Sequence, residues 1–213
     1  MRVIVYVEGP SDQLAMQELL APLLFQLQAK GTAVAFIPTG NKGRLMATTP
    51  RKAANILRND PQTVVVAMPD LYPGNVGHPH RSPDELRDVL KEQFARTLRV
   101  KGTNDARLRA RFKVFCFKHD LEALILAAED ELRERLGSPV LQRSWVIPVE
   151  DQDMDTPPKR IVEGLFRQYK DSYHDTVDAP LILGAAGYRA IADACPQCFA
   201  PFVAFLESLL QEV

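Results

Sequence analysis

Short apolar runs alternate with longer amphipathic stretches along the first 136 residues. The apolar runs are rich in β-branched and aromatic residues and stop at glycine, proline or polar positions, which is typical of strands. We expect four such strands, at residues 2–7, 33–38, 63–68 and 112–117. Their hydrophobicity is continuous rather than alternating, as in a parallel sheet that helices cover on both faces. The pattern therefore predicts an α/β fold with a four-stranded, mostly parallel sheet.

The segments between these strands carry helix signals. Ser11 is the expected N-cap of a leucine-rich helix, which Pro22 should bend or split. After a polar loop at residues 40–44, Pro50 is expected at the first position of the next helix. Ser82-Pro83 has the same form, an N-cap followed by a proline. A further helix is predicted over residues 121–136, and it completes the core.

The strand–helix alternation stops after residue 136. Trp145–Val149 is a possible fifth strand, and helices are predicted at 157–170, at 179–194 and after Pro201. We therefore divide the chain into an α/β core, residues 1–136, and a mainly helical C-terminal extension, residues 137–213, packed on that core.

The composition is that of an ordinary globular protein, with 46% hydrophobic and 25% charged residues, which excludes disordered and collagen-like classes. The net charge of −1 hides a division, because residues 1–113 carry +7 and residues 114–213 carry −8. No apolar run approaches the roughly 18 residues of a membrane span, and the N-terminal run is too short for a signal peptide. Three cysteines do not make a disulfide framework. A cytoplasmic location without membrane contact is the expectation.

Carboxylates follow three of the predicted strands. Glu8 ends the first, Asp70 the third, and Asp120 and Glu122 follow the fourth. Ligands of open parallel sheets gather beyond the carboxyl ends of the strands, and oxygen-only clusters suit Mg²⁺ or Mn²⁺. Such an ion can activate water and neutralise charge as a phosphodiester breaks. Asp12 and Asp120 also fit the simpler role of helix caps, whereas a buried Glu8 or Asp70 would need a cation or a strong donor.

Two groups of basic residues suit phosphate. Lys42 and Arg44 lie in the glycine-bearing loop after the second strand, which is otherwise a polar turn. A second group precedes the fourth strand: Arg96, Arg99, Lys101, Arg107, Arg109, Arg111 and Lys113. It fits either a phosphate backbone or a solvated helix end, and its few aromatic neighbours argue against dedicated single-strand binding.

Two further motifs carry little functional weight. Cys195 and Cys198 form a lone Cys-x-x-Cys without the other ligands that zinc requires. The acidic run at residues 150–155 is best explained as favouring the positive end of the helix that follows it.

The motifs together resemble a known domain. A strand ending in Glu8-Gly9-Pro10-Ser11-Asp12, followed by a strand ending in Asp70, is similar to the Toprim domain. The run from His119 to Leu124 resembles an acidic motif of the nuclease domain of overcoming-lysogenisation-defect family proteins. The stretch Gly184–Pro196 is similar to one in a small standalone Toprim-related family of unassigned function.

This resemblance implies roles for three residues. Glu8 would be a metal ligand or general acid/base, Asp70 a metal ligand, and Glu122 a second-metal or water-positioning ligand. The usual second motif is Asp-x-Asp, but here Tyr72 replaces the second aspartate, and a protonated phenol is a poor Mg²⁺ ligand. Either Glu122, Asp120 or Asp12 supplies the missing charge, or the site binds metal weakly.

Two main functions from different classes remain. The first is a Mg²⁺- or Mn²⁺-dependent, nuclease-like hydrolase of DNA or RNA. Its catalytic residues would be Glu8, Asp70 and Glu122, with Asp120 as a further metal ligand. Its nucleic-acid contacts would be Lys42, Arg44, Arg107, Arg109 and Arg111. The alternative is a catalytically degenerate Toprim-like nucleic-acid-binding or regulatory subunit that works with a separately encoded ATPase partner. A small-molecule phosphatase is a weaker third reading.

Overall fold

The computed structural model describes residues 1–72, 74, 79–102, 105–142 and 144–211. Its centre is a sheet of four strands in the order β2-β1-β3-β4, and every pairing is parallel. The strands are β1 (Arg2–Val7), β2 (Ala33–Pro38), β3 (Thr63–Ala67) and β4 (Phe112–Val114). The predicted α/β class and parallel sheet are confirmed, with β4 three residues shorter than expected, because only an isolated Asp70–Phe117 bridge continues its pairing.

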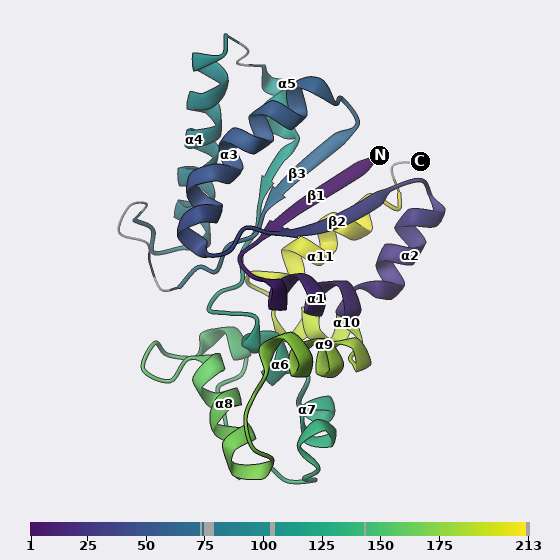
Figure 1. The fold of residues 1–213 in the computed structure, drawn as a ribbon, viewed down its shortest axis with the longest axis vertical. Coiled ribbons are helices and arrows are strands. Elements are labelled where there is room, and N and C mark those ends of the chain that lie inside the picture. Colours follow the sequence, from purple (N-terminus) through teal and green to yellow (C-terminus); the bar gives the residue numbers. More distant parts are fainter. Residues whose placement is uncertain (73, 75–78, 103–104, 143, 212–213) are drawn as a thin grey trace.

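Helices cover both faces of the sheet (Figure 1). They are α1 (Pro10–Leu19), α2 (Ala21–Ala29), α3 (Lys42–Asn59), α4 (Pro83–Val100), α5 (Ala106–Ala110), α6 (Glu122–Ala127), α7 (Glu129–Leu136), α8 (Pro158–Tyr169), α9 (Asp175–Ala185), α10 (Tyr188–Ala194) and α11 (Phe199–Ser208). β1 shows why both faces are apolar. Val3, Val5 and Val7 join the core beneath α1 and α2, while Ile4 and Tyr6 join the core beneath α3 and α4.

The first two helix starts differ from the expected ones. Gly9, not Ser11, is the N-cap of α1. The split predicted at Pro22 occurs two residues earlier, at Leu20, and Pro22 lies in the first turn of α2. α3 begins at Lys42, because the Asn41 side chain accepts a hydrogen bond from the Arg44 amide and caps the helix. Pro50 therefore lies inside α3 rather than at its start. Ser82 caps α4 as predicted.

The segment after α7 contains the main error in the predicted elements. No strand forms at the described residues between 144 and 148, where Ile147–Pro148 is a cis peptide, and the 3₁₀ turn η1 (Val149–Asp151) follows. Glu150 does not serve the next helix. Its carboxylate accepts hydrogen bonds from the amides of Gln197, Cys198 and Phe199, and so it caps α11 instead.

The C-terminal helices pack directly on the sheet and its first helices. α9 lies against α1, and Phe202 of α11 packs edge-on against Phe36 of β2. Residues from both halves of the chain form one buried apolar cluster. The predicted helix at 179–194 is two helices, α9 and α10, which break at Ala186 and Gly187. None of the helices in the described part of the chain has the length and apolarity that crossing a bilayer requires.

Candidate functional site

A cavity of about 400 Å³ opens at the carboxyl ends of β1 and β3. Its walls come from β1 and the start of α1, the β2–α3 turn, the segment after β3, the start of α6, and α8. The lining residues are Glu8, Gly9, Ser11, Asp12, Gly40, Asn41, Asp70, Tyr72, Asp120, Leu121, Glu122 and Lys159. The fold thus brings the four predicted metal ligands, Glu8, Asp70, Asp120 and Glu122, to one cavity.

Glu8 and Asp70 are neighbours across adjacent parallel strands. The Asp70 amide donates a hydrogen bond of 2.9 Å to Glu8 Oε1. Burial raises the pKa of Glu8 to about 7, against the opposing effect of that hydrogen bond. Burial also raises the pKa of Asp70 well above its ordinary value, and the charges of Glu8, Asp12, Asp120 and Glu122 raise it further. The two carboxyls therefore hold a proton more readily than ordinary acids do.

Asp12 has a defined structural role. Its Oδ2 accepts hydrogen bonds from the amides of Glu8, at 3.1 Å, and Gly9, at 2.9 Å. These bonds fix the turn between β1 and α1 and so aim Glu8 into the cavity. The capping role that the sequence suggested for Asp12 is observed, although it works from the third position of the helix.

Asp120 and Glu122 enter from the segment after β4. Asp120 Oδ2 accepts a hydrogen bond of 3.3 Å from the Lys159 amide, while its buried Oδ1 has no hydrogen-bond partner among the described residues. Burial, followed by the charge of Glu122, raises the pKa of Asp120 to about 7. Only 4% of the Glu122 side chain is exposed, and burial raises the pKa of this group too.

Lys159 is the residue that sequence reasoning missed. It belongs to α8, and its Nζ lies 3.6 Å from Glu122 Oε1 and 3.7 Å from Asp175 Oδ2. Burial lowers the pKa of Lys159, but the neighbouring carboxylates outweigh burial and hold the pKa above its ordinary value. No local pattern marks this lysine, because its role comes from the packing of α8 beside α6.

Lys42 lies at the same edge of the sheet. Its Nζ donates a hydrogen bond of 2.8 Å to the Leu71 carbonyl oxygen. Burial lowers the pKa of Lys42, and the carboxylates of Glu8 and Asp70 oppose that shift. Arg44 lies two residues further along α3 and is exposed.

The other predicted phosphate contacts lie elsewhere. Arg107 and Arg109 belong to α5, which precedes β4 and therefore lies at the amino edge of the sheet, opposite the cavity (Figure 1). Arg111 has a structural role, because its guanidinium donates to the carbonyls of Leu57 and Asp60 at the end of α3 and of Thr63 at the start of β3. The fold brings none of these three arginines to the cavity.

The Tyr72 side chain does not stand in for the missing aspartate. Its hydroxyl donates a hydrogen bond of 3.0 Å to the Arg81 carbonyl, and its ring lies 5.5 Å from the His119 ring. Tyr72 has no carboxylate, and its phenol oxygen is engaged with the backbone. The residue that replaces the second aspartate of the motif therefore does not supply the missing charge.

Comparison with known proteins gives the family. The profile of a family described as "Domain of unknown function (DUF4276)" matches residues 7–207. The chain belongs to this family. No curated protein matches it. Among solved structures, it is similar to the C-terminal region of the Burkholderia pseudomallei OLD protein, at 17% identity over 98% of both chains with a TM-score of 0.49. It is also similar to the C-terminal region of the Xanthomonas campestris pv. campestris OLD protein, at 17% identity over 98% of this chain and 92% of that one, with a TM-score of 0.44.

Likenesses of this degree assign no role to any residue, so the chemistry of this DUF4276 member depends on its own cavity. Among the described residues, no three acidic, histidine or cysteine side chains already surround one point as ligands of a metal ion. Mg²⁺ does not need three, because it commonly takes one or two carboxylates and keeps several waters. The oxygen-only donor set and the unpartnered, buried Asp120 Oδ1 fit that mode of binding.

The cysteines lie outside this cavity. Cys116, after β4, and Cys198, before α11, approach to 3.3 Å between their sulfur atoms in the core beneath α3 and α4. The hydrogen bond between them, together with burial, raises the pKa of the Cys116 thiol. This contact joins residues far apart in the sequence, and the Cys-x-x-Cys spacing does not predict it.

Proposed function

We propose that this chain is a Mg²⁺- or Mn²⁺-dependent phosphodiesterase of nucleic acid that acts at the carboxylate-lined cavity. The observation that carries the proposal is the position of Asp70. This buried carboxyl lies where the charges of four other carboxylates, Glu8, Asp12, Asp120 and Glu122, add to one another. Like charges gathered in a buried place are costly unless protons or a cation compensate them. The Toprim resemblance of the motifs supports the same site.

Each residue of the cavity has its own role in this proposal. Glu8, Asp70, Asp120 and Glu122 would hold the ion, and Asp12 keeps Glu8 in place through the β1–α1 turn. A bound Mg²⁺ would supply charge neutralisation at the phosphate and a more acidic water. A carboxyl with a pKa of about 7, such as Glu8, can exchange a proton near neutral pH. Lys42 and Lys159 flank the carboxylates and would contact phosphate oxygens.

The direct test is cleavage of supercoiled plasmid and of RNA with Mg²⁺ or Mn²⁺. We expect wild-type protein to cleave one of them and Glu8→Gln to lose activity by about 100-fold or more. Glu18→Gln, which removes an exposed carboxylate of α1 outside the cavity, is the matched control and should keep full activity. Absence of wild-type cleavage with both ions, or equal activity of Glu8→Gln, would contradict the catalytic proposal.

A second function is favoured by Tyr72. Tyr72 replaces the usual second carboxylate of the motif, and its hydroxyl donates to the Arg81 carbonyl. On this alternative the chain is a nucleic-acid-binding or regulatory subunit that works with a separate ATPase. Calorimetry that detects no Mg²⁺ or Mn²⁺ binding, together with salt-sensitive binding of DNA, would favour it over the phosphodiesterase.

A further inference from the structure

α3 has an unusual charge pattern for an exposed helix. Its 18 residues include five basic side chains and no acidic one. The basic residues are Lys42, Arg44, Arg51, Lys52 and Arg58. The neighbouring α4, by contrast, carries both signs, and its Glu92 pairs with Arg96 and Arg99. The positive charge of α3 is therefore not balanced within the helix.

The arginines of α3 form one line. Arg44, Arg51 and Arg58 are seven residues apart, which is two helical turns and about 10.5 Å. All three are exposed, and within the described ranges their guanidiniums make no ion pair or hydrogen bond. Lys52 is also exposed, and its ammonium lies 5.1 Å from the centre of the Tyr6 ring.

Helix stability does not explain this pattern. Acidic residues are favoured in the first turn of a helix because they complement its positive end. The first turn of α3 has none and carries Lys42 and Arg44 instead. Cations at that end are unfavourable for the helix. The carboxylates of Glu8 and Asp70 face Lys42, so Arg44 is the cation of this turn that points to a ligand rather than to folding.

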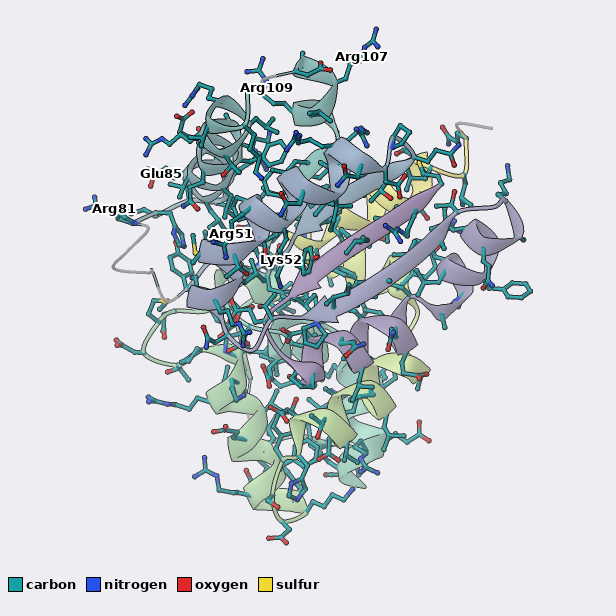
Figure 2. The ribbon with its side chains drawn as sticks, turned by 45° about the horizontal axis from the view of Figure 1, so that its top comes forward. Arg51, Lys52, Arg81, Glu85, Arg107 and Arg109 are labelled. Atoms are coloured by element: carbon teal, nitrogen blue, oxygen red, sulfur yellow. The ribbon has the colours of Figure 1, made fainter. Side chains whose placement is uncertain are left out.

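The line of arginines on α3 runs from the cavity toward the opposite edge of the sheet. Asn41, which caps α3, also lines the cavity, so the helix starts at the cavity mouth. Its far end packs near α5, whose Arg107 and Arg109 are exposed and carry no ion pair among the described residues. Figure 2 shows Arg51 and Lys52 on α3, with Arg107 and Arg109 further along on α5 in the same view.

We propose that Arg44, Arg51, Lys52, Arg58, Arg107 and Arg109 form a basic track that binds the phosphate backbone of duplex nucleic acid. The duplex would run along α3 with one strand at the cavity, so this inference rests on the proposed function and names its substrate class. α3 is about 27 Å long, which matches about 8 base pairs at 3.4 Å each. None of the exposed large apolar residues of the described chain lies on α3, so the track lacks a surface for stacking unpaired bases.

The test removes charge from the track and leaves the cavity intact. The triple variant Arg51→Gln, Lys52→Gln, Arg58→Gln is compared with Lys30→Gln, Arg167→Gln, Arg189→Gln, which removes the same charge from the C-cap of α2, from α8 and from α10. Anisotropy of labelled DNA duplexes is measured between about 50 and 200 mM salt. We expect the track variant to lose about two to three units of the slope of log Kd against log salt, and the control to keep the wild-type slope. Wild-type affinity should rise steeply up to a duplex of about 8 base pairs and little beyond.

Three results would contradict the proposal that the basic track binds a duplex. They are an unchanged slope in the track variant, an equal loss in the control, and tighter wild-type binding of single strands than of duplexes of the same length. Cleavage of a small diester, bis(4-nitrophenyl) phosphate, separates this inference from the proposed function. The track variant should cleave that diester at the wild-type rate. Absence of diester and plasmid cleavage by the wild type would refute the phosphodiesterase alone, because the binding measurements need no turnover.

Discussion

Lys159 shows how much a single residue can change the charge of the cavity. Its ammonium lies between Glu122 and Asp175, and its backbone amide binds Asp120. It thus compensates part of the carboxylate charge. A metal ion at the same carboxylates would be repelled by this ammonium, so Lys159 sets an upper limit on metal affinity.

The variant Lys159→Met should therefore bind Mg²⁺ more tightly. Removing one positive charge a few ångströms from a divalent cation is worth ~1 kcal/mol even at the dielectric constant of water, which is about fivefold in affinity. Cleavage should fall, because the lysine is also a proposed phosphate contact. Calorimetric titration with Mg²⁺ checks the first effect and the plasmid assay the second.

Lys170→Met is the control, since Lys170 is exposed and, among the residues that the structure describes, the only hydrogen bond of its Nζ is to the Arg135 carbonyl. Weaker Mg²⁺ binding by Lys159→Met than by this control would show that Lys159 helps to hold the metal site together rather than opposing the ion.

At the scale of elements, one carboxylate joins two distant segments. Glu150 lies in η1 and is 2% exposed, yet it accepts three backbone amides at the start of α11. Beside it, Asp151 pairs with Lys118, which follows β4. The C-terminal helix is thereby connected through η1 to the segment that leads to Asp120 and Glu122.

Glu150→Ala should destabilise the fold by about 3–5 kcal/mol, because it leaves buried amides without an acceptor and removes the charge that caps α11. Urea denaturation followed by circular dichroism measures the change. Asp155→Ala removes an exposed carboxylate of the same acidic run and should alter the free energy of unfolding by less than about 0.5 kcal/mol. Similar losses in the two variants would mean that the run acts through net charge.

At the scale of the whole molecule, the carboxyls of the cavity should make folding stability depend on pH. The pKa of Glu8 is about 7 in the folded chain, against an ordinary value of 4.5, and Asp120 is shifted in the same direction to about 7 from 3.8. Between about pH 4 and pH 7 the unfolded chain therefore loses protons that the folded chain retains, so stability falls as the pH rises. For Glu8 alone the loss is about 3 kcal/mol at most.

We therefore expect the metal-free protein to melt at a lower temperature at about pH 8 than at about pH 5.5. Lys42 and Lys159 face the same carboxylates and limit the effect. Mg²⁺ should raise the melting temperature more at the higher pH, where the carboxylates are ionised. Glu8→Gln, which cannot ionise, should reduce the difference between the two pH values. Equal melting temperatures for the wild type at both would contradict the shifted pKa values.

The sheet and part of the site could be predicted from the local pattern of apolar and polar residues in the sequence. β1 and β2 have the predicted bounds, and Glu8, Asp70, Asp120 and Glu122 line one cavity because parallel strands end at a common edge. The predicted strand at Trp145–Val149 was wrong. Its apolar residues resemble a strand, but Val149 is the only buried residue of the described segment 144–149. The division at residue 136 and the catalytic roles stay predictions.

The sequence by itself therefore determined the four parallel strands, their helices and the carboxylates at their ends, because periodicity and chain order are local properties. Only the tertiary structure decided which charges meet. It placed Lys159 beside Glu122, turned the Tyr72 hydroxyl to a backbone carbonyl and used Arg111 to bind the end of α3. These contacts join residues that are distant in sequence or depend on side-chain direction. The electrostatics of a buried site depends on distances and solvent exclusion, which exist only once the chain has packed.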